Sequence, residues 1–469
     1  MNRWILVSAA ALASACASVD STATVYRCES SDGSRYYGNH ALPGARCQVV
    51  PIDGGQPTTS APGAPAPAAG PAPAPPPQGA PAGASAGEAG GGPVRPDTRR
   101  GVADAGALPP VAAAYDFIDE RANLLEFRHG SALAAFSRKW SDPRPQPIVV
   151  AHFGDSHIQN GFAVEVARRR LQQLRGDAGR GMLFPYAIAR TYSHNDYTSS
   201  YEGTWASANS IEQVPKLPVG VSGFVARTTD PKAAFTISFR QPPAAGTKRI
   251  KVFLRTAAAG WRLTAISAGR RVSLDLDAFP AGASPFVEFT LPELGSTLRF
   301  ELGGAPEPAS AFELHAVSIE NDAPGVLYHN LGVGGANFGA LLAQRHFAEQ
   351  FRALAPDLVV LDWGTNDIAY RNEVPERHVE VVESTIRAIR AVSPETTIVL
   401  TSVQDMNYRG RHVSAAADYA ALMRTLAFRN GCAFYDWYRV SGGAQSMRHW
   451  FANALASNDQ LHLTARGFA

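Results

Sequence analysis

The sequence predicts an α/β fold: a parallel β-sheet with helices on both faces, interrupted by an all-β insert. Beyond about residue 110, short β-branched apolar runs alternate with helix-like stretches, which is typical of βαβ units. Between residues 233 and 321 the pattern changes to short alternating runs separated by Gly, Pro and Ser, which indicates a sandwich or a jelly roll. We therefore expect an α/β domain in two parts, 111–232 and 322–469.

The N-terminal residues 1–23 have the pattern of a secretory signal peptide, with one Arg, an apolar run and then small residues. The mature protein is therefore expected in the periplasm. Ala13-Ser14-Ala15-Cys16 resembles a lipoprotein processing site, at which Cys16 would be acylated and anchored in the outer membrane. Ala15-Cys16-Ala17 also satisfies the ordinary cleavage rule, so both alternatives stay open. No later segment has the roughly 20 apolar residues that a membrane span needs, so any membrane attachment is expected through the lipid.

Residues 24–53 are interpreted as a small β module with one disulfide. Cys28 and Cys47 enclose short β-prone runs on either side of Asp32-Gly33, which is a hairpin signal. A disulfide between the two cysteines would stabilise so small a module by about 3 kcal/mol. A metal site would need a second Cys pair, and Cys432 is interpreted as a buried strand residue. The module resembles a small disulfide-bearing domain of unknown function that is often found at the N-terminus of exported proteobacterial proteins.

Residues 54–110 consist almost entirely of Ala, Pro and Gly. Such a composition cannot build a core, so this segment is expected to be a disordered linker. At ~3.1 Å per residue, its roughly 55 residues could reach up to about 170 Å.

The charge balance gives no support for a nucleic-acid partner. Lys and Arg total 43 against 41 Asp and Glu, so the chain is nearly neutral. The basic run considered as a possible nucleic-acid contact is Arg168-Arg169-Arg170. We interpret these three arginines as the solvated face of a helix.

The α/β alternation is predicted from nine segments. The strands are expected at 148–153, 326–329, 358–363, 397–402 and 433–436, and the helices at 158–174, 340–354, 376–391 and 415–429. In such a sheet, ligand sites lie at the carboxyl ends of the strands. The residues that follow each strand are therefore the candidates for function.

The first strand runs into Gly154-Asp155-Ser156 and then into a helix. A serine at this junction projects its hydroxyl outward and has its backbone N–H at the positive end of the helix dipole, which suits a nucleophile. The alternative is that Asp155 or Ser156 merely caps the helix. The residues at the other strand ends decide between these interpretations.

Three later stretches also end strands and carry polar or glycine-rich sequence. They are LYHNLGVGGANF with Gly332, Gly334 and Gly335, LDWGTNDIAY with Asn366, and NDQLHLTARGF with Asp459 and His462. Asp459 and His462 are three residues apart, a spacing that lets the carboxylate orient the imidazole.

These residues together fit acyl transfer to a serine. Ser156 would attack an ester carbonyl, His462 would take its proton, and Asp459 would orient and stabilise His462. The backbone N–H groups of Ser156 and Gly335 and the side-chain amide of Asn366 could stabilise the oxyanion. No cofactor and no metal are expected, because the 12 His residues include no His-Glu-x-x-His arrangement.

In this order, GDS, NxGxGG, GTND and DxxH resemble the four blocks of the SGNH/GDSL hydrolase superfamily. The resemblance covers roughly residues 148–469 without the insert. It implies a three-layer, flavodoxin-like hydrolase domain whose functional residues map onto Ser156, Gly335, Asn366, Asp459 and His462.

Within the superfamily, the chain resembles the peptidoglycan O-acetylesterases. This resemblance rests on GDSHIQ, GRGMLFPYAIARTY, the β insert, and SMRHW before a DxxHLT ending. The resemblance implies an exported serine esterase that removes O-acetyl groups from a cell-wall glycan. Two alternatives stay open: an O-acetyltransferase that acylates an exported polysaccharide with the same serine, and a catalytically inactive wall-binding protein.

Several other residues have a structural and a functional interpretation. His157 is interpreted as a solvated or capping residue, and His194 with Asp196 as a pair that lacks mutual orientation. Asp362 is expected to be a hydrogen-bonded structural carboxylate. Trp205 and Trp261 could stack on sugar rings beside the active face, although an aromatic residue in such an insert is more often part of the core.

Overall fold

The computed structural model describes residues 25–29, 35–38, 46–50 and 115–469, apart from 143–145, 257–259, 279–283 and 309. The predicted signal peptide, the acylation site at Cys16 and the linker lie outside these residues. Within them, no helix is both long and apolar enough to cross a membrane.

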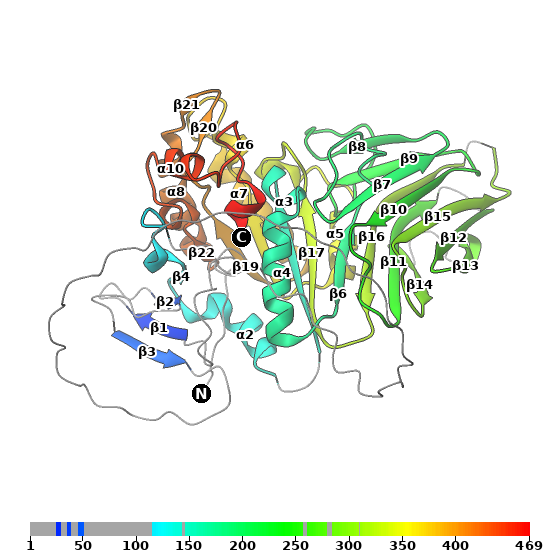
Figure 1. Ribbon diagram of the computed structural model, residues 1–469, viewed down its shortest axis with the longest axis horizontal. Helices are drawn as coiled ribbons and strands as arrows, with labels where there is room; N and C mark the ends of the chain where they lie inside the picture. The colour runs from blue at the N-terminus through cyan, green and yellow to red at the C-terminus, as the bar shows by residue number, and fades with distance from the viewer. Residues whose placement is uncertain are drawn as a thin grey trace, which may run out of the picture. The chain divides into compact units, whose positions relative to one another are not determined.

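The catalytic half of the fold is built on five parallel strands, which confirm the five predicted ones. In spatial order they are β17 (Gly325–Gly332), β5 (Pro147–Gly154), β18 (Leu358–Asp362), β19 (Thr397–Thr401) and β22 (Ala433–Tyr435). Numbered along the chain, this is the order 2-1-3-4-5 of a doubly wound, flavodoxin-like sheet. The topological switch lies beside β5, the strand that leads to Ser156. Figure 1 shows β17, β19 and β22 of this sheet.

Helices cover both faces of this sheet, as the alternation of strands and helices predicts. Ile148 and Val150 of β5 belong to a cluster with α2 (Ala134–Trp140) and α4 (Phe162–Arg175). Ala151 and Phe153 belong to the cluster on the opposite face, with the helices α5 (Phe347–Leu354), α7 (His378–Val392) and α8 (Ala415–Arg429). Because the strands are buried on both faces, they consist of continuous apolar runs.

Short elements connect these strands and helices and complete the fold. The helices are α3 (Ser156–Gln159), α6 (Thr365–Ile368), α9 (Trp437–Val440), α10 (Met447–Ala452) and α11 (Ala465–Phe468), with single 3-10 turns at Glu120–Ala122, Gly130–Leu133, Leu276–Ala278 and Phe338–Ala340 and a hairpin of β20 (Asn407–Tyr408) and β21 (Arg411–His412).

The first predicted helix, 158–174, is interrupted in the structure. Gly161 has φ +85° and separates α3 from α4, so the chain turns directly after the serine. The helix predicted at 340–354 begins only at Phe347. On α4, Arg168 is buried and pairs with Glu165 at 2.5 Å, so the prediction of a fully solvated arginine face is wrong at this residue.

The N-terminal residues extend the sheet through antiparallel strands. β4 (Leu124–Phe127) pairs with β22, and beyond it lie β2 (Arg35–Gly38), β1 (Val25–Glu29) and β3 (Arg46–Val50). The antiparallel pairing of β1 with β2 confirms the predicted hairpin. Cys28 lies opposite Cys47 in the β1–β3 register, and because the side chain of Cys28 is outside the described residues, the disulfide stays a prediction.

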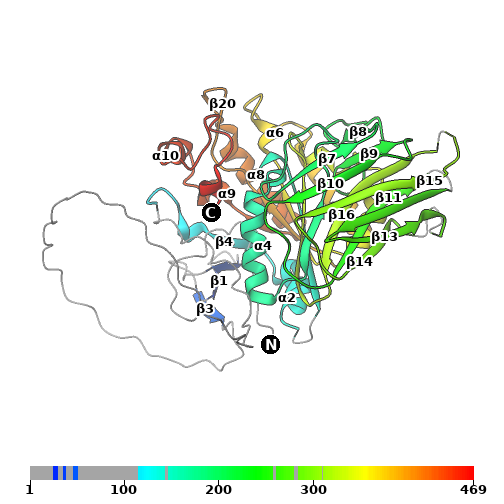
Figure 2. The ribbon, with the colours of Figure 1, turned by 45° about the vertical axis from the view of Figure 1, so that its right-hand side comes forward.

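Two antiparallel sheets form a sandwich next to β17, in the place of the predicted insert (Figures 1 and 2). One has the order β13 (Arg270–Asp275), β12 (Trp261–Ser267), β15 (Thr297–Gly304), β10 (Ala234–Phe239), β7 (Tyr197–Glu202). The other has the order β14 (Phe286–Leu291), β11 (Lys248–Thr256), β16 (Phe312–Asn321), β9 (Phe224–Thr228), β8 (Ala206–Asn209), and β6 (Gly179–Leu183) pairs with β16. The sandwich thus includes four strands that precede residue 233.

The core of the sandwich is aromatic, and Trp261 belongs to it. Trp261 is 1% exposed, its ring lies 6.0 Å from that of Phe312, and its indole N–H donates to Ser310 Oγ at 2.8 Å. Trp205 also packs edge-on against Phe235 and Phe312. Of the two interpretations of Trp261, the structural one is therefore correct.

Replacing Trp261 with Ala should lower the free energy of unfolding by about 3–5 kcal/mol, because the change opens a cavity between the two sheets and leaves Ser310 without its donor. Urea denaturation of the purified protein measures the effect. Arg262→Ala on the same strand is the matched control, since the Arg262–Asp275 pair is exposed and its loss should leave the stability nearly unchanged. Equal stability of the Trp261 variant and the wild type would contradict the core assignment.

Candidate active site

The site is assembled by the register of three neighbouring parallel strands. Gly154 at the end of β5 is paired with Gly332 of β17 on one side and with Asp362 of β18 on the other. The chain segments that leave these strands therefore begin at one level of the sheet. They carry Ser156, Gly335 and Asn366, in agreement with the expectation that all three follow strand ends.

Ser156 begins α3 two residues after a position that must be glycine. A Cβ on Gly154 would lie 2.2 Å from Ile158 Cγ1 and 2.8 Å from the Asp362 carbonyl oxygen, so no larger residue fits between strand and helix. Asp155 caps the helix, because its Oδ1 accepts the backbone N–H of His157 at 2.9 Å. The capping interpretation is thus correct for Asp155, and it leaves the Ser156 hydroxyl available for chemistry.

Ser156, His462 and Asp459 form one hydrogen-bonded chain. Ser156 Oγ lies 2.7 Å from His462 Nε2, and His462 Nδ1 lies 2.6 Å from Asp459 Oδ2. With Asp459 accepting from Nδ1–H, Nε2 is the nitrogen that can take the serine proton. The structure thus brings Ser156 together with His462, 306 positions further along the chain, and with the neighbouring Asp459.

A tight turn, rather than a helix, brings Asp459 and His462 together. Asp459 Oδ1 accepts the backbone N–H groups of Leu461 and His462, each at 3.0 Å, and Gln460 has φ +53°. Burial opposes ionisation of Asp459, but the hydrogen bonds from the side chain and backbone of His462 and from the Leu461 N–H hold its pKa below the usual value. The carboxylate is therefore ionised at neutral pH.

The two other candidates for the oxyanion hole flank the serine. Gly335 has φ +87°, which presents its backbone N–H at an exposed turn. Asn366 is held by its Nδ2, which donates to the Ala336 carbonyl at 2.9 Å and lies 3.4 Å from Asp155 Oδ2. Among the residues that the structure describes, the backbone N–H groups of Ser156 and Gly335 have no acceptor, so both are available to an oxyanion.

Sequence reasoning missed two buried residues beside the serine. Gln159 accepts the Gly334 N–H at 2.6 Å and donates to the Tyr192 carbonyl at 3.1 Å, so it fixes the glycine turn. His157 is buried, which makes its interpretation as a solvated residue wrong. The sequence did contain a signal for both. His157 and Gln159 are polar residues within four positions of the nucleophile, on a helix that must pack on the sheet.

Two other predicted polar groups have structural roles. His194 Nδ1 and Asp196 Oδ1 are 2.5 Å apart, so the expectation that they lack mutual orientation is wrong. Burial lowers the pKa of His194 to about 3, and the neutral ring packs against Gly161. Asp362 accepts from Thr401 Oγ1 at 2.7 Å and lies 3.3 Å from His152 Nε2, which confirms its structural interpretation.

Among the residues that the structure describes, two clusters have donor atoms close enough together for a cation: Glu313, His315 and His346, and Glu165, His194 and Asp196. Neither includes a residue of the serine chain. In the second, Glu165 pairs with Arg168 and Asp196 with Arg180, so the arginines already neutralise the carboxylates.

Residues 303–469 match the family model of the GDSL-like Lipase/Acylhydrolase family. Ser156 lies outside the matched residues because the sandwich separates its block from the other three. A solved peptidoglycan O-acetylesterase has 22% identity and a TM-score of 0.58, with 72% of this chain and 92% of that chain covered. The chain carries an SGNH/GDSL hydrolase domain, and it is a serine ester hydrolase.

Other solved structures match less of the fold. A GDSL-like lipase from Bacteroides thetaiotaomicron VPI-5482 has 21% identity and a TM-score of 0.22, with 30% of this chain and 69% of that chain covered. A family two carbohydrate esterase from Clostridium thermocellum has 11% identity and a TM-score of 0.22, with 50% of this chain and 89% of that chain covered. No curated protein matches the chain. The O-acetylesterase structure is therefore the likeness that supports the fold, since the match covers 92% of that chain.

Ser156→Ala and His462→Ala should each lower kcat of the hydrolase on p-nitrophenyl acetate by roughly 10⁴-fold or more, since they remove the nucleophile and its base. Asp459→Asn should cost less, because Asp459 orients the base and takes no proton. Steady-state kinetics on variants with unchanged circular dichroism measures all three. Near-wild-type turnover by a folded His462 variant would contradict the assignment.

Proposed function

We propose that this hydrolase is an exported esterase that removes O-acetyl groups from a cell-wall glycan, with peptidoglycan as the substrate. The observation that carries the proposal is the openness of the site: Asp459, Gly335 and Asn366 are exposed, and Ser156 and His462 are partly so. A polymer can lie across such a surface and present a small acyl group to the serine. Water also reaches the same groups, which favours hydrolysis over transfer to a second sugar.

The contacts support a two-step reaction. Ser156 Oγ attacks the acetyl carbonyl while His462 Nε2 takes its proton, and the oxyanion is stabilised by the Ser156 and Gly335 N–H groups. The Asn366 amide joins them when the N–H of its long contact to Asp155 turns to the oxyanion. His462 then protonates the leaving sugar oxygen, which leaves an acetyl-serine. In the second step His462 takes a proton from water, the resulting hydroxide attacks the acetyl carbon, and Ser156 leaves with the proton that His462 returns, releasing acetate.

The side chains that line the site beside Gly334 and Gly335 favour a substrate that contains a sugar ring. A Cβ built on Gly334 would meet the Tyr192 hydroxyl at 2.4 Å, and one on Gly335 would meet Ile211 Cδ1 at 3.3 Å. Tyr192 is 44% exposed and Ile211 46%, although both are large and apolar. They come from the chain between β6 and β9, so strands of the sandwich position them. An exposed aromatic face next to a nucleophile is suited to stacking on a sugar.

Three further features support the choice of substrate and location. The matched structure of similar fold is a peptidoglycan O-acetylesterase, although 22% identity speaks for the fold alone. The first 23 residues have the pattern of an export signal. The Ala/Pro/Gly-rich segment 54–110 is long enough to let a catalytic domain work at a distance from an anchor at Cys16.

Purified protein should release acetate from O-acetylated peptidoglycan and none from the same material after mild alkaline de-O-acetylation. An enzymatic acetate assay measures this, with Ser156→Ala as the control. Release from O-acetylated xylan at a higher rate than from peptidoglycan would overturn the choice of glycan. A rise in acetylated sugar on an added acceptor would instead support the transferase.

Tyr192→Ala should lower kcat/KM on O-acetylated peptidoglycan by about 10-fold or more while changing kcat/KM on p-nitrophenyl acetate less than about 3-fold, because only the polymer gains from stacking outside the catalytic groups. Tyr192→Phe keeps the ring and should retain most activity on both substrates. Tyr201→Ala, an exposed tyrosine on β7, is the control. A parallel loss on both substrates in Tyr192→Ala would show that the ring supports the glycine turn instead.

A further inference from the structure

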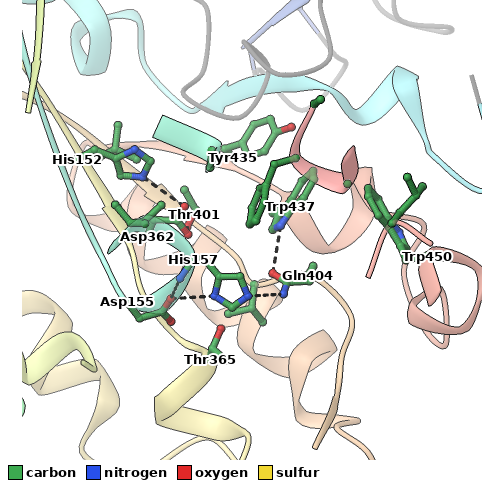
Figure 3. A pocket seen from close by; sticks show the side chains of 18 of the residues that line it. His152, Asp155, His157, Asp362, Thr365, Thr401, Gln404, Tyr435, Trp437 and Trp450 are labelled. Carbon is green, nitrogen blue, oxygen red and sulfur yellow. Dashed lines mark hydrogen bonds and ion pairs between the residues drawn. The ribbon is translucent and has the colours of Figure 1, made fainter. Parts of the chain in front are cut away.

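His157 occupies a buried position between the two halves of the catalytic machinery. It is 7% exposed; its Nδ1 lies 2.9 Å from Asp155 Oδ1, and its Nε2 lies 3.0 Å from the Leu461 carbonyl oxygen. Its ring packs on that of His462, with 4.8 Å between the centroids. Figure 3 shows the imidazole between Asp155 on one side and Gln404 on the other.

Asp155 and the Leu461 carbonyl are both hydrogen-bond acceptors, so both ring nitrogens are suited to donate. The Gln404 amide nitrogen also lies 3.0 Å from Nε2, and it donates to the same carbonyl. Asp155 is 2% exposed and needs a compensating positive charge. Burial of His157 disfavours its charged form, but the charge of Asp155, the hydrogen bonds to Asp155 and Leu461, and the more distant Asp362 raise its pKa to about 9. Because this pKa lies above neutral pH, the ring is an imidazolium under ordinary conditions.

Each of these two partners is the chain neighbour of a reacting residue. Asp155 precedes Ser156, and its Oδ2 also lies 3.4 Å from the Asn366 amide nitrogen. Leu461 precedes His462. The imidazolium thus connects the turn of the nucleophile with the turn of the base, two segments that are 304 residues apart in the chain.

The surrounding side chains hold this connection rigidly. Gln404 Nε2 donates to the same Leu461 carbonyl at 2.9 Å, and the Trp437 indole N–H donates to Gln404 Oε1 at 3.2 Å, which fixes the orientation of the amide (Figure 3). Behind them is a cavity of about 130 Å³ that Trp437, Trp450 and His157 help to line. Neither Ser156 nor His462 lines it, so His157 separates the cavity from the catalytic pair.

We propose that His157 is a positioning residue of the hydrolase: its doubly donating ring joins Asp155 to the Leu461 carbonyl and so sets the distance from Ser156 Oγ to His462 Nε2. The proposal rests on the serine mechanism of the proposed function and is independent of which glycan is the substrate. A misplacement of about 1 Å at a reacting pair can cost on the order of 10²-fold in rate. Loss of either hydrogen bond should therefore reduce catalysis without removing any reacting group.

Two substitutions separate the two hydrogen bonds. In His157→Asn, the amide can replace Nδ1 and keep the donor to Asp155, but it does not reach Leu461. In His157→Gln, the longer amide can replace Nε2 and keep the donor to Leu461, but it does not bond Asp155. Each variant should lower kcat on p-nitrophenyl acetate by about 10- to 100-fold with KM within about 3-fold, and exposed His449→Gln is the matched control that should match the wild type.

The pH profile tests the doubly protonated ring without any substitution. A pKa raised above its ordinary value keeps the ring charged below about pH 9, so the connection persists through neutral pH and is lost as the pH rises through about 9. Wild-type kcat/KM should therefore fall with an inflection near pH 9, and both variants should lack this inflection. The charged or titratable groups that face the ring are Asp155, Asp362 and His462.

The outcomes distinguish positioning from mere stability. The rate of phosphonylation of Ser156 by a fluorophosphonate, counted per folded molecule, should fall in parallel with kcat in both His157 variants. The proposal would be overturned if both His157 variants reacted with the fluorophosphonate and turned over substrate at the wild-type rate per folded molecule. It would also be overturned if the pH profile of the wild-type enzyme had no alkaline inflection. Activity of Ser156→Ala, measured in the same assay, would instead overturn the serine mechanism itself.

Discussion

The site depends on the close approach of α3 to the ends of three parallel strands. Gly154 lies where β5, β18 and α3 meet, and there is no room for a side chain at its position. A larger residue would push α3 away from the sheet and move Ser156 relative to Gly335 and Asn366, which are carried by the neighbouring strands. Because the strands are buried on both faces, the sheet cannot shift to compensate. The geometry of the oxyanion hole is thus fixed by backbone packing rather than by flexible side chains.

A layer of buried polar groups lies beneath this backbone frame. Thr401 and His152 contact Asp362, and the Tyr328 hydroxyl lies 2.8 Å from His152 Nδ1. These groups satisfy one another inside the sheet, so the carboxylate at the end of β18 is not left unpaired. Nearer the surface, Asp155 is balanced by His157. The carboxylates of Asp155 and Asp362 are therefore compensated, and exposed Asp459 is left to orient the base.

The sequence sufficed to predict the α/β half and the reacting residues because both depend on local signals. Five buried strands are mostly apolar runs, and Ser156, Gly335 and Asn366 follow strand ends in short stretches whose residue types suit only a few roles. The sandwich was predicted too short because β7 and β8, YTSSYE and ASAN, are mostly exposed and lack an apolar alternation. Trp261 was ambiguous because a core indole and a binding indole look the same until Ser310 and Phe312 are known to surround it.

The residues that sequence reasoning missed share a different property: their partners are distant in the chain. His157 bonds Leu461, and Gln159 bonds Gly334 and Tyr192. No spacing rule connects such pairs, because the connection exists only after the sheet has aligned β5 with β17. The sandwich is inserted between these same two strands. Since one end of the insert continues from the nucleophile segment and the other enters β17, strands of the sandwich hold Tyr192 and Ile211 at the rim of the oxyanion turn. The insert therefore shapes the substrate surface without supplying any of the reacting groups.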